Sequence, residues 1–161
     1  MKTIGVTGGV GCGKSEVLDH IEKQYNAIIL KADELAATLK EKGGPCYQLL
    51  ADLLGEDVLT DKRKMAQAIF SDPELLAKVN AIVHPIVKEE ILQRMREAGE
   101  GRLKTARGTT ADYFILEAAL LLEEGYDQLV DEMWYIYAPE EVRHERLSKG
   151  RGYTREKTAF P

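Results

Sequence analysis

Eight residues near the N-terminus limit the fold of this chain more than any other part of the sequence. Gly8 to Ser15 read Gly-Gly-Val-Gly-Cys-Gly-Lys-Ser and match the pattern G-x-x-x-x-G-K-[ST] in full. Alternating apolar residues precede this stretch at 3–7, and apolar residues at helical spacing follow it. The sequence therefore predicts a strand, a phosphate-binding loop and a helix, which together open an α/β protein.

The chemistry of this loop is specific for a nucleoside triphosphate. Its glycines let consecutive backbone N–H groups face one anion at a helix N-terminus. We expect Lys14 to reach the β- and γ-phosphates of ATP, and the Ser15 hydroxyl to be one ligand of Mg²⁺. A flexible glycine-rich turn, the alternative, leaves the Lys-Ser pair unexplained. The predicted ATP-binding residues are Gly8, Gly9, Val10, Gly11, Cys12, Gly13, Lys14 and Ser15.

Alternation of strands and helices in the rest of the chain predicts a parallel sheet. Further strands are expected at 27–30, 113–118 and 132–138, and a mostly helical block at 34–99 separates the second strand from the third. Residues 100–112 read as an exposed connector, and a helix follows Pro139 and ends at Gly150.

Composition and charge narrow the class of protein. A chain of 161 residues with 44% hydrophobic content suits one domain with a real core. A net charge of -5 argues against a broad nucleic-acid surface, and no stretch resembles a membrane anchor or a secretory signal. Two cysteines without metal-ligand spacing fit a reducing cytosol, so we expect a cytoplasmic protein.

Asp33 is the first candidate for chemistry outside the loop. It follows the second predicted strand, at the sheet edge where ligands of α/β proteins bind, and suits a base beside the γ-phosphate. The alternative is that Asp33 only caps a helix that begins at Glu34. A GTPase is disfavoured, because the chain has no N-K-x-D run to read guanine.

Several segments, in order along nearly the whole chain, resemble the dephospho-coenzyme A kinase family. They are Ile4 to Ser15, Ala32-Asp33, Gly44-Pro45-Cys46-Tyr47 leading to Leu54-Gly55, Val83-His84-Pro85, and Leu120-Leu121-Leu122-Glu123. The resemblance implies transfer of the ATP γ-phosphate to the ribose 3′-hydroxyl of dephospho-coenzyme A, with Asp33 as the catalytic carboxylate. It also implies a three-layer P-loop kinase fold with a core at 1–33 and 113–138, a helical acceptor-binding insertion at 34–99, and a lid at 139–158.

Further site residues follow from the resemblance. It implies acceptor contacts from His84, from Lys62 in place of the family's usual arginine, and from Arg63. His84 precedes Pro85 at a predicted helix break, and a histidine that ties down a local turn there is the alternative. Glu117 stands where the family has aspartate, and is a candidate metal-side residue together with Ser15.

The segment after Pro139 carries the basic residues of the expected lid. Arg146 and Arg151 match lid positions of the family and are the predicted catalytic arginines, whereas Arg143 is a weaker match. Because Glu141 and Glu145 interleave with these bases, a solvated and ion-paired helix face is the alternative.

The family continues beyond the lid with a helix, a strand and a final helix, and this sequence contains no counterpart of them. We therefore expect that the C-terminal part of the family fold is absent, and that stability is reduced or depends on association. Expected partners are ATP and dephospho-coenzyme A, without nucleic acid or membrane, in a monomer or weak homo-oligomer. Two rivals stay open: another P-loop kinase of a small metabolite, of the nucleoside monophosphate or shikimate type, and a nucleotide-binding protein without turnover.

Overall fold

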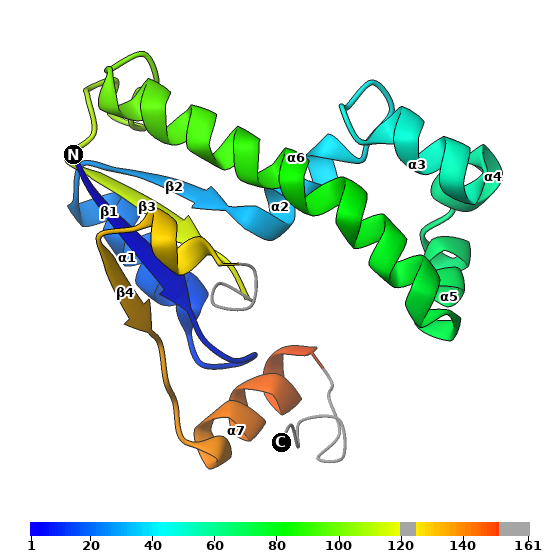
Figure 1. The fold of residues 1–161 in the computed structure, drawn as a ribbon. Helices are drawn as coiled ribbons and strands as arrows, with labels where there is room; N and C mark the ends of the chain where they lie inside the picture. The colour runs from blue at the N-terminus through cyan, green and yellow to red at the C-terminus, as the bar shows by residue number, and fades with distance from the viewer. Residues whose placement is uncertain (120–124, 152–161) are drawn as a thin grey trace. The chain divides into compact units, whose positions relative to one another are not determined.

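The computed structural model describes residues 1–119 and 125–151, except for the side chains of Lys62 and of residues 149–151. The chain forms two compact units (Figure 1). The first contains residues 1–30 and the chain from 97 onward, and the second contains residues 31–96. Each unit is described separately below.

The first unit is built on a parallel sheet of four strands in the order β2-β3-β1-β4. Strand β1 pairs with β3 from Lys2↔Tyr113 to Val6↔Glu117, and with β4 on its other side. The strands are β1 (Lys2–Thr7), β2 (Ala27–Lys31), β3 (Tyr113–Glu117) and β4 (Glu132–Tyr135). The helices of this unit are α1 (Lys14–Gln24), the short 3₁₀ helix η1 (Tyr126–Leu129) and α7 (Glu140–Arg151).

Apolar side chains of the central strands and of α1 form the core of the first unit. Ile4 and Val6 on β1 and Ile115 on β3 pack with Leu18 and Ile21 on α1, whose spacing places them on one face of the helix. All three central residues of β3 are fully buried, as expected for a parallel strand covered on both faces. The α/β class with a parallel sheet is thus confirmed.

The start of β4 is tied to β1 by a side-chain anchor. Oδ2 of Asp131 accepts hydrogen bonds from the backbone N–H of Thr3 at 2.8 Å and from its hydroxyl at 2.7 Å. These two donors lower the pKa of the Asp131 carboxyl below its ordinary value, because they favour its ionised form. The anchor helps to set the register in which Ile4 lies opposite Glu132.

The second unit is helical. Its helices are α2 (Ala32–Leu39), α3 (Tyr47–Leu54), α4 (Glu56–Leu59), α5 (Lys62–Ser71) and the long α6 (Pro73–Gly99), whose last three residues belong to the first unit. Asp72 caps α6, because its Oδ1 accepts from the backbone N–H groups of Glu74 and Leu75, both at 3.0 Å. Pro73 takes the first position of the helix, where proline is favoured because its missing N–H would have no partner within the helix.

Three predicted ends of elements in the first unit are wrong, and one of them, the end of β3 at Glu117 instead of 118, differs by a single residue. Strand β4 ends at Tyr135 instead of Ala138, because its partner β1 ends at Thr7 and the last backbone bond runs from Ile136 N–H to the Thr7 carbonyl, at 2.8 Å. Helix α7 continues past Gly150 to Arg151, so this glycine does not mark its end. Glycine lowers helix propensity, but a helix already formed tolerates it.

The predicted helix break at the His84-Pro85 pair is also wrong, because α6 runs through Pro85. Proline removes one backbone hydrogen bond and crowds the carbonyl four residues earlier, that of Ala81. Ala81 and Pro85 are both exposed, so water can solvate that carbonyl. Buried apolar residues on the opposite face stabilise α6 by packing. They recur at four-residue spacing and are Val79, Val83, Val87 and Ile91.

The connector is less exposed than predicted. Thr105 and Ala111 within it are buried, and the Thr105 hydroxyl lies 3.0 Å from Oδ1 of Asn26. Across the described residues, no helix is both long and apolar enough to cross a membrane.

Candidate active site

The loop between β1 and α1 has a backbone that requires glycine. Gly13, the residue before α1, has φ +95° and Gly8 has φ +150°, conformations that side chains strongly disfavour. At Gly8 space is also lacking, because a β-carbon would lie 2.3 Å from the Ile136 carbonyl oxygen. The chain therefore turns from β1 into the N-terminus of α1 as a phosphate-binding loop does.

Lys14 is the first residue of α1 and its ammonium lies over the loop. Its Nζ donates to the Gly8 carbonyl at 2.5 Å and lies 3.9 Å from Oε1 of Glu117. Both charged side chains are largely shielded from solvent, with 18% and 12% of their surface exposed. Glu117 is the last residue of β3, next to β1 in the sheet, so the two side chains meet at the carboxyl edge.

Ser15 and Glu117 are two described residues of this unit with oxygen atoms of the kind that bind a magnesium ion. The Ser15 side chain is exposed, and hydroxyl and carboxylate oxygens are donors that Mg²⁺ accepts. Within the described residues, no group of three or more His, Cys, Asp or Glu side chains is arranged to hold a metal ion. Magnesium usually keeps several waters and takes only one or two protein ligands beside substrate phosphates.

Helix α7 packs against the same loop. A β-carbon on Gly11 would lie 3.1 Å from Cγ of Leu147, and Leu147 is buried. Nη1 of Arg146, the residue before Leu147, lies 3.4 Å from the Gly11 carbonyl, a long hydrogen bond. Arg143 also faces the loop, because a β-carbon on Gly9 would lie 3.1 Å from its Nη1. The basic side chains of Arg143 and Arg146 therefore lie on the side of the loop that faces α7.

Parts of the predicted lid, and one segment that contributed to the family resemblance, fall partly or wholly outside the described residues. The backbone of Arg151 ends α7, but its side chain is not described. The segment 120–123, which contributed to the family resemblance, and the expected lid beyond residue 151 are likewise outside the described residues.

The remaining predicted site residues lie in the second unit. Asp33 is the second residue of α2 and is exposed, whereas Lys31 takes the N-cap position. Since α2 begins at Ala32, the alternative that Asp33 caps a helix starting at Glu34 is wrong. His84 is partly buried on α6, and Arg63 is exposed near the start of α5. The side chain of Lys62 is not described.

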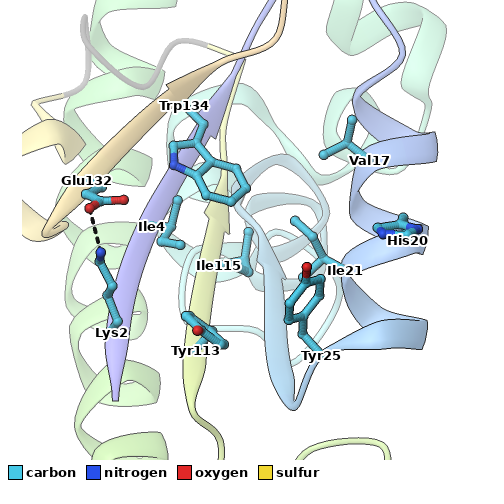
Figure 2. Close-up of a pocket in the computed structure, with 10 residues that line it drawn as sticks. All are labelled: Lys2, Ile4, Val17, His20, Ile21, Tyr25, Tyr113, Ile115, Glu132 and Trp134. Carbon is cyan, nitrogen blue, oxygen red and sulfur yellow. Dashed lines mark hydrogen bonds and ion pairs between the residues drawn. The ribbon is translucent and has the colours of Figure 1, made fainter.

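A separate apolar pocket of about 370 Å³ lies against the sheet and α1 (Figure 2). Its wall contains Ile4, His20, Tyr25, Tyr113 and Trp134, together with an ion pair whose Nζ–Oε1 distance is 2.5 Å, between Lys2 and Glu132. The Lys2 ammonium lowers the pKa of the Glu132 carboxyl. None of the predicted site residues lines this pocket, so it is distinct from the loop.

Sequence reasoning missed the contact that Leu147 makes with the loop and gave Arg143 a lesser role than Arg146. A signal was present, because residues 143, 146 and 147 are three and four apart and share one helix face. Only the fold shows that this face is turned toward the loop.

The sheet order, the glycine-rich turn after the first strand and the lysine at the start of α1 define a P-loop nucleotide-binding protein of the α/β class. Comparisons with known proteins narrow this class. The family model for dephospho-CoA kinase matches residues 2–159. The chain therefore belongs to the dephospho-CoA kinase family.

Individual relatives agree with this assignment. A dephospho-CoA kinase from Carboxydothermus hydrogenoformans is 35% identical over 95% of this chain and 72% of its own length. One from Aquifex aeolicus is 36% identical over 97% of this chain and 76% of its own. The crystal structure of TT1252 from Thermus thermophilus superposes with a TM-score of 0.77 at 32% identity, over 98% of this chain and 76% of that one.

Proposed function

We propose that this chain transfers the γ-phosphoryl group of ATP to the 3′-hydroxyl of the ribose of dephospho-coenzyme A, which gives coenzyme A and ADP. Family membership supports the choice of acceptor. The observation that carries the chemistry is the pairing of Lys14 with Glu117 above a loop whose backbone requires glycine. A cation held there is suited to the charge that develops on the transferring phosphate.

The loop and Lys14 act on the phosphates of ATP. Backbone N–H groups of the loop and the positive end of α1 hold the phosphate oxygens, and Lys14 moves from the Gly8 carbonyl to these oxygens. Arg146 adds a second cation from α7 and helps to keep water from the reacting phosphate. Because the transition state is loose, most of the rate enhancement comes from positioning and charge neutralisation.

Magnesium belongs to this site as the usual companion of ATP. The Ser15 hydroxyl and the Glu117 carboxylate would hold it, Glu117 directly or through water. When bound, the ion neutralises charge on the β- and γ-phosphate oxygens. Glu117 also orients Lys14, since their charged atoms lie within ion-pair distance at 3.9 Å.

Asp33 is our candidate for the base that acts on the acceptor. It is the second residue after β2, a strand of the sheet that carries the loop, and it is exposed. As the new bond forms between the 3′-oxygen and the γ-phosphorus, the Asp33 carboxylate takes the hydroxyl proton, and the bond to the ADP oxygen breaks. His84, Lys62, Arg63 and Arg151 remain proposed contacts of the acceptor or of the phosphates.

The setting that we propose is a reducing cytoplasm. Both cysteines, Cys12 and Cys46, are free and buried. Burial raises the pKa of the Cys46 thiol, which keeps it in the less reactive protonated form.

Replacement of Asp33 by asparagine tests this assignment. The amide keeps the shape of the side chain but cannot take a proton, so Asp33→Asn should bind ATP as the wild type does and lose about 10²–10⁴-fold in turnover. Coenzyme A is measured by mass spectrometry after incubation with Mg-ATP and dephospho-coenzyme A. Glu34→Gln, one residue further on the exposed start of α2, is the matched control and should keep full turnover. Full turnover in Asp33→Asn would exclude Asp33 as the base.

A further inference from the structure

The two arginines of α7 that face the loop have different surroundings. Arg146 is exposed, and its Nη1 has an acceptor in the Gly11 carbonyl. Arg143 is half-buried, and its Nε is shielded from solvent and has no hydrogen-bond partner among the described residues. One helix therefore presents a cation that the loop already satisfies and another whose N–H lacks an acceptor.

A shielded N–H without an acceptor is unfavourable, and for a charged group the cost is higher. Carboxylates of α7 are the first candidates for a partner, but Oε1 of Glu140 pairs with His144 instead, at 3.2 Å. The Arg143 side chain also lies beside the loop, because a β-carbon on Gly9 would lie 3.1 Å from its Nη1. A ligand that this loop binds would meet the guanidinium at Nη1, and a shift of the side chain would then bring Nε an acceptor as well.

A phosphate group can supply the hydrogen-bond acceptors that the Arg143 guanidinium needs. A guanidinium donates through several N–H groups in one plane, and this fork matches two oxygens of a phosphate. We propose that Arg143 binds the phosphate chain of the nucleotide on the Gly9 side of the loop, and that it contributes more to phosphate affinity than the sequence pattern indicates. The proposal deepens the proposed function and rests on it only for the identity of the nucleotide.

The direct test compares equilibrium binding of Mg-ATP and of inorganic tripolyphosphate, by calorimetry, to the full chain and to Arg143→Met. Methionine keeps much of the apolar stem and removes the charge and all N–H donors. Loss of a charge-assisted fork should weaken both ligands by about tenfold or more. Arg143→Lys keeps the charge without the fork and should weaken them by about threefold.

Arg107→Met is the matched control. It removes the same charge from the same unit, but the Arg107 side chain donates to the Lys23 carbonyl, near the opposite end of α1, at 2.6 Å. Its affinity for both ligands should stay within about twofold of the wild type, because it lies away from the loop.

Thermal unfolding separates ligand binding from a purely structural role. Since the Nε of Arg143 has no partner among the residues that the structure describes, Arg143→Met should not lower the melting temperature without ligand, but it should reduce the rise caused by Mg-ATP. The proposal would be overturned if Arg143→Met melted at a lower temperature without ligand and Mg-ATP still raised its melting temperature as much as in the wild type. Wild-type affinity for both ligands in Arg143→Met would also overturn it. If that variant does not fold, wild-type affinity in Arg143→Lys overturns it instead.

Neither measurement requires dephospho-coenzyme A. A wild-type protein that forms no coenzyme A would therefore contradict the proposed function and leave the test of Arg143 intact.

Discussion

In the function that we propose, phosphate binding and catalysis both depend on Lys14. Its ammonium is held by the Gly8 carbonyl and Glu117 beside the loop, so no rearrangement of the helix is needed before it meets a phosphate. A cation that is already in place costs little reorganisation when charge develops. Removal of the Lys14 ammonium should therefore weaken the binding of ATP and also raise the energy of the transition state.

Lys14→Ala should weaken ATP binding by about tenfold and lower turnover by about a further 10²-fold, because the charge acts most strongly on the transition state. Binding is measured by calorimetry and turnover by coenzyme A formation. Lys23→Ala, in the last turn of the same helix, is the control and should change neither. A variant with unchanged turnover at saturating ATP would show that Lys14 serves binding alone.

At the residue scale, the sequence predicted the loop well, because its glycines and the Lys-Ser pair are local features of one turn. The neighbours of those residues were harder to predict. Glu117 lies beside Lys14 because β1 and β3 are adjacent in the sheet, although the two residues are about a hundred positions apart. Such a contact depends on strand order, which no local pattern contains.

Helix α6 shows how one element withstands a local defect. Its buried stripe, with a valine or isoleucine every fourth residue from Val79 to Ile91, outweighs the bond lost at Pro85. The sequence predicted a break there because proline propensity is local, whereas the packing that opposes it is not. Similarly, β4 was predicted too long because its apolar run continues after its partner strand has ended.

The cap of α6 gives a prediction at this scale. Asp72→Ala removes the acceptor of two backbone N–H groups and should lower the free energy of unfolding by about 1 kcal/mol. Asp72→Asn keeps an oxygen in the same position and should be close to the wild type. Urea denaturation followed by circular dichroism measures both. Equal stability of the two variants would mean that the cap contributes nothing.

At the scale of the whole molecule, the alternation of strands and helices correctly predicted an α/β protein with a parallel sheet. The sequence pattern did not predict the strand order β2-β3-β1-β4, because that order depends on the packing of segments distant in sequence. The two units also divide the proposed chemistry. The loop, Lys14 and α7 belong to the first, and Asp33, His84 and Arg63 to the second.

The central claim is that this chain phosphorylates dephospho-coenzyme A. The most direct measurement is a panel in which the chain and Mg-ATP are incubated separately with dephospho-coenzyme A, nucleoside monophosphates and shikimate, with products identified by mass spectrometry. We predict that dephospho-coenzyme A alone is phosphorylated. Nuclear magnetic resonance of the product should show coupling between the new phosphorus and the 3′ position of the ribose. Phosphorylation of another acceptor, or ATP binding with no phosphorylated acceptor at high protein concentration, would contradict it.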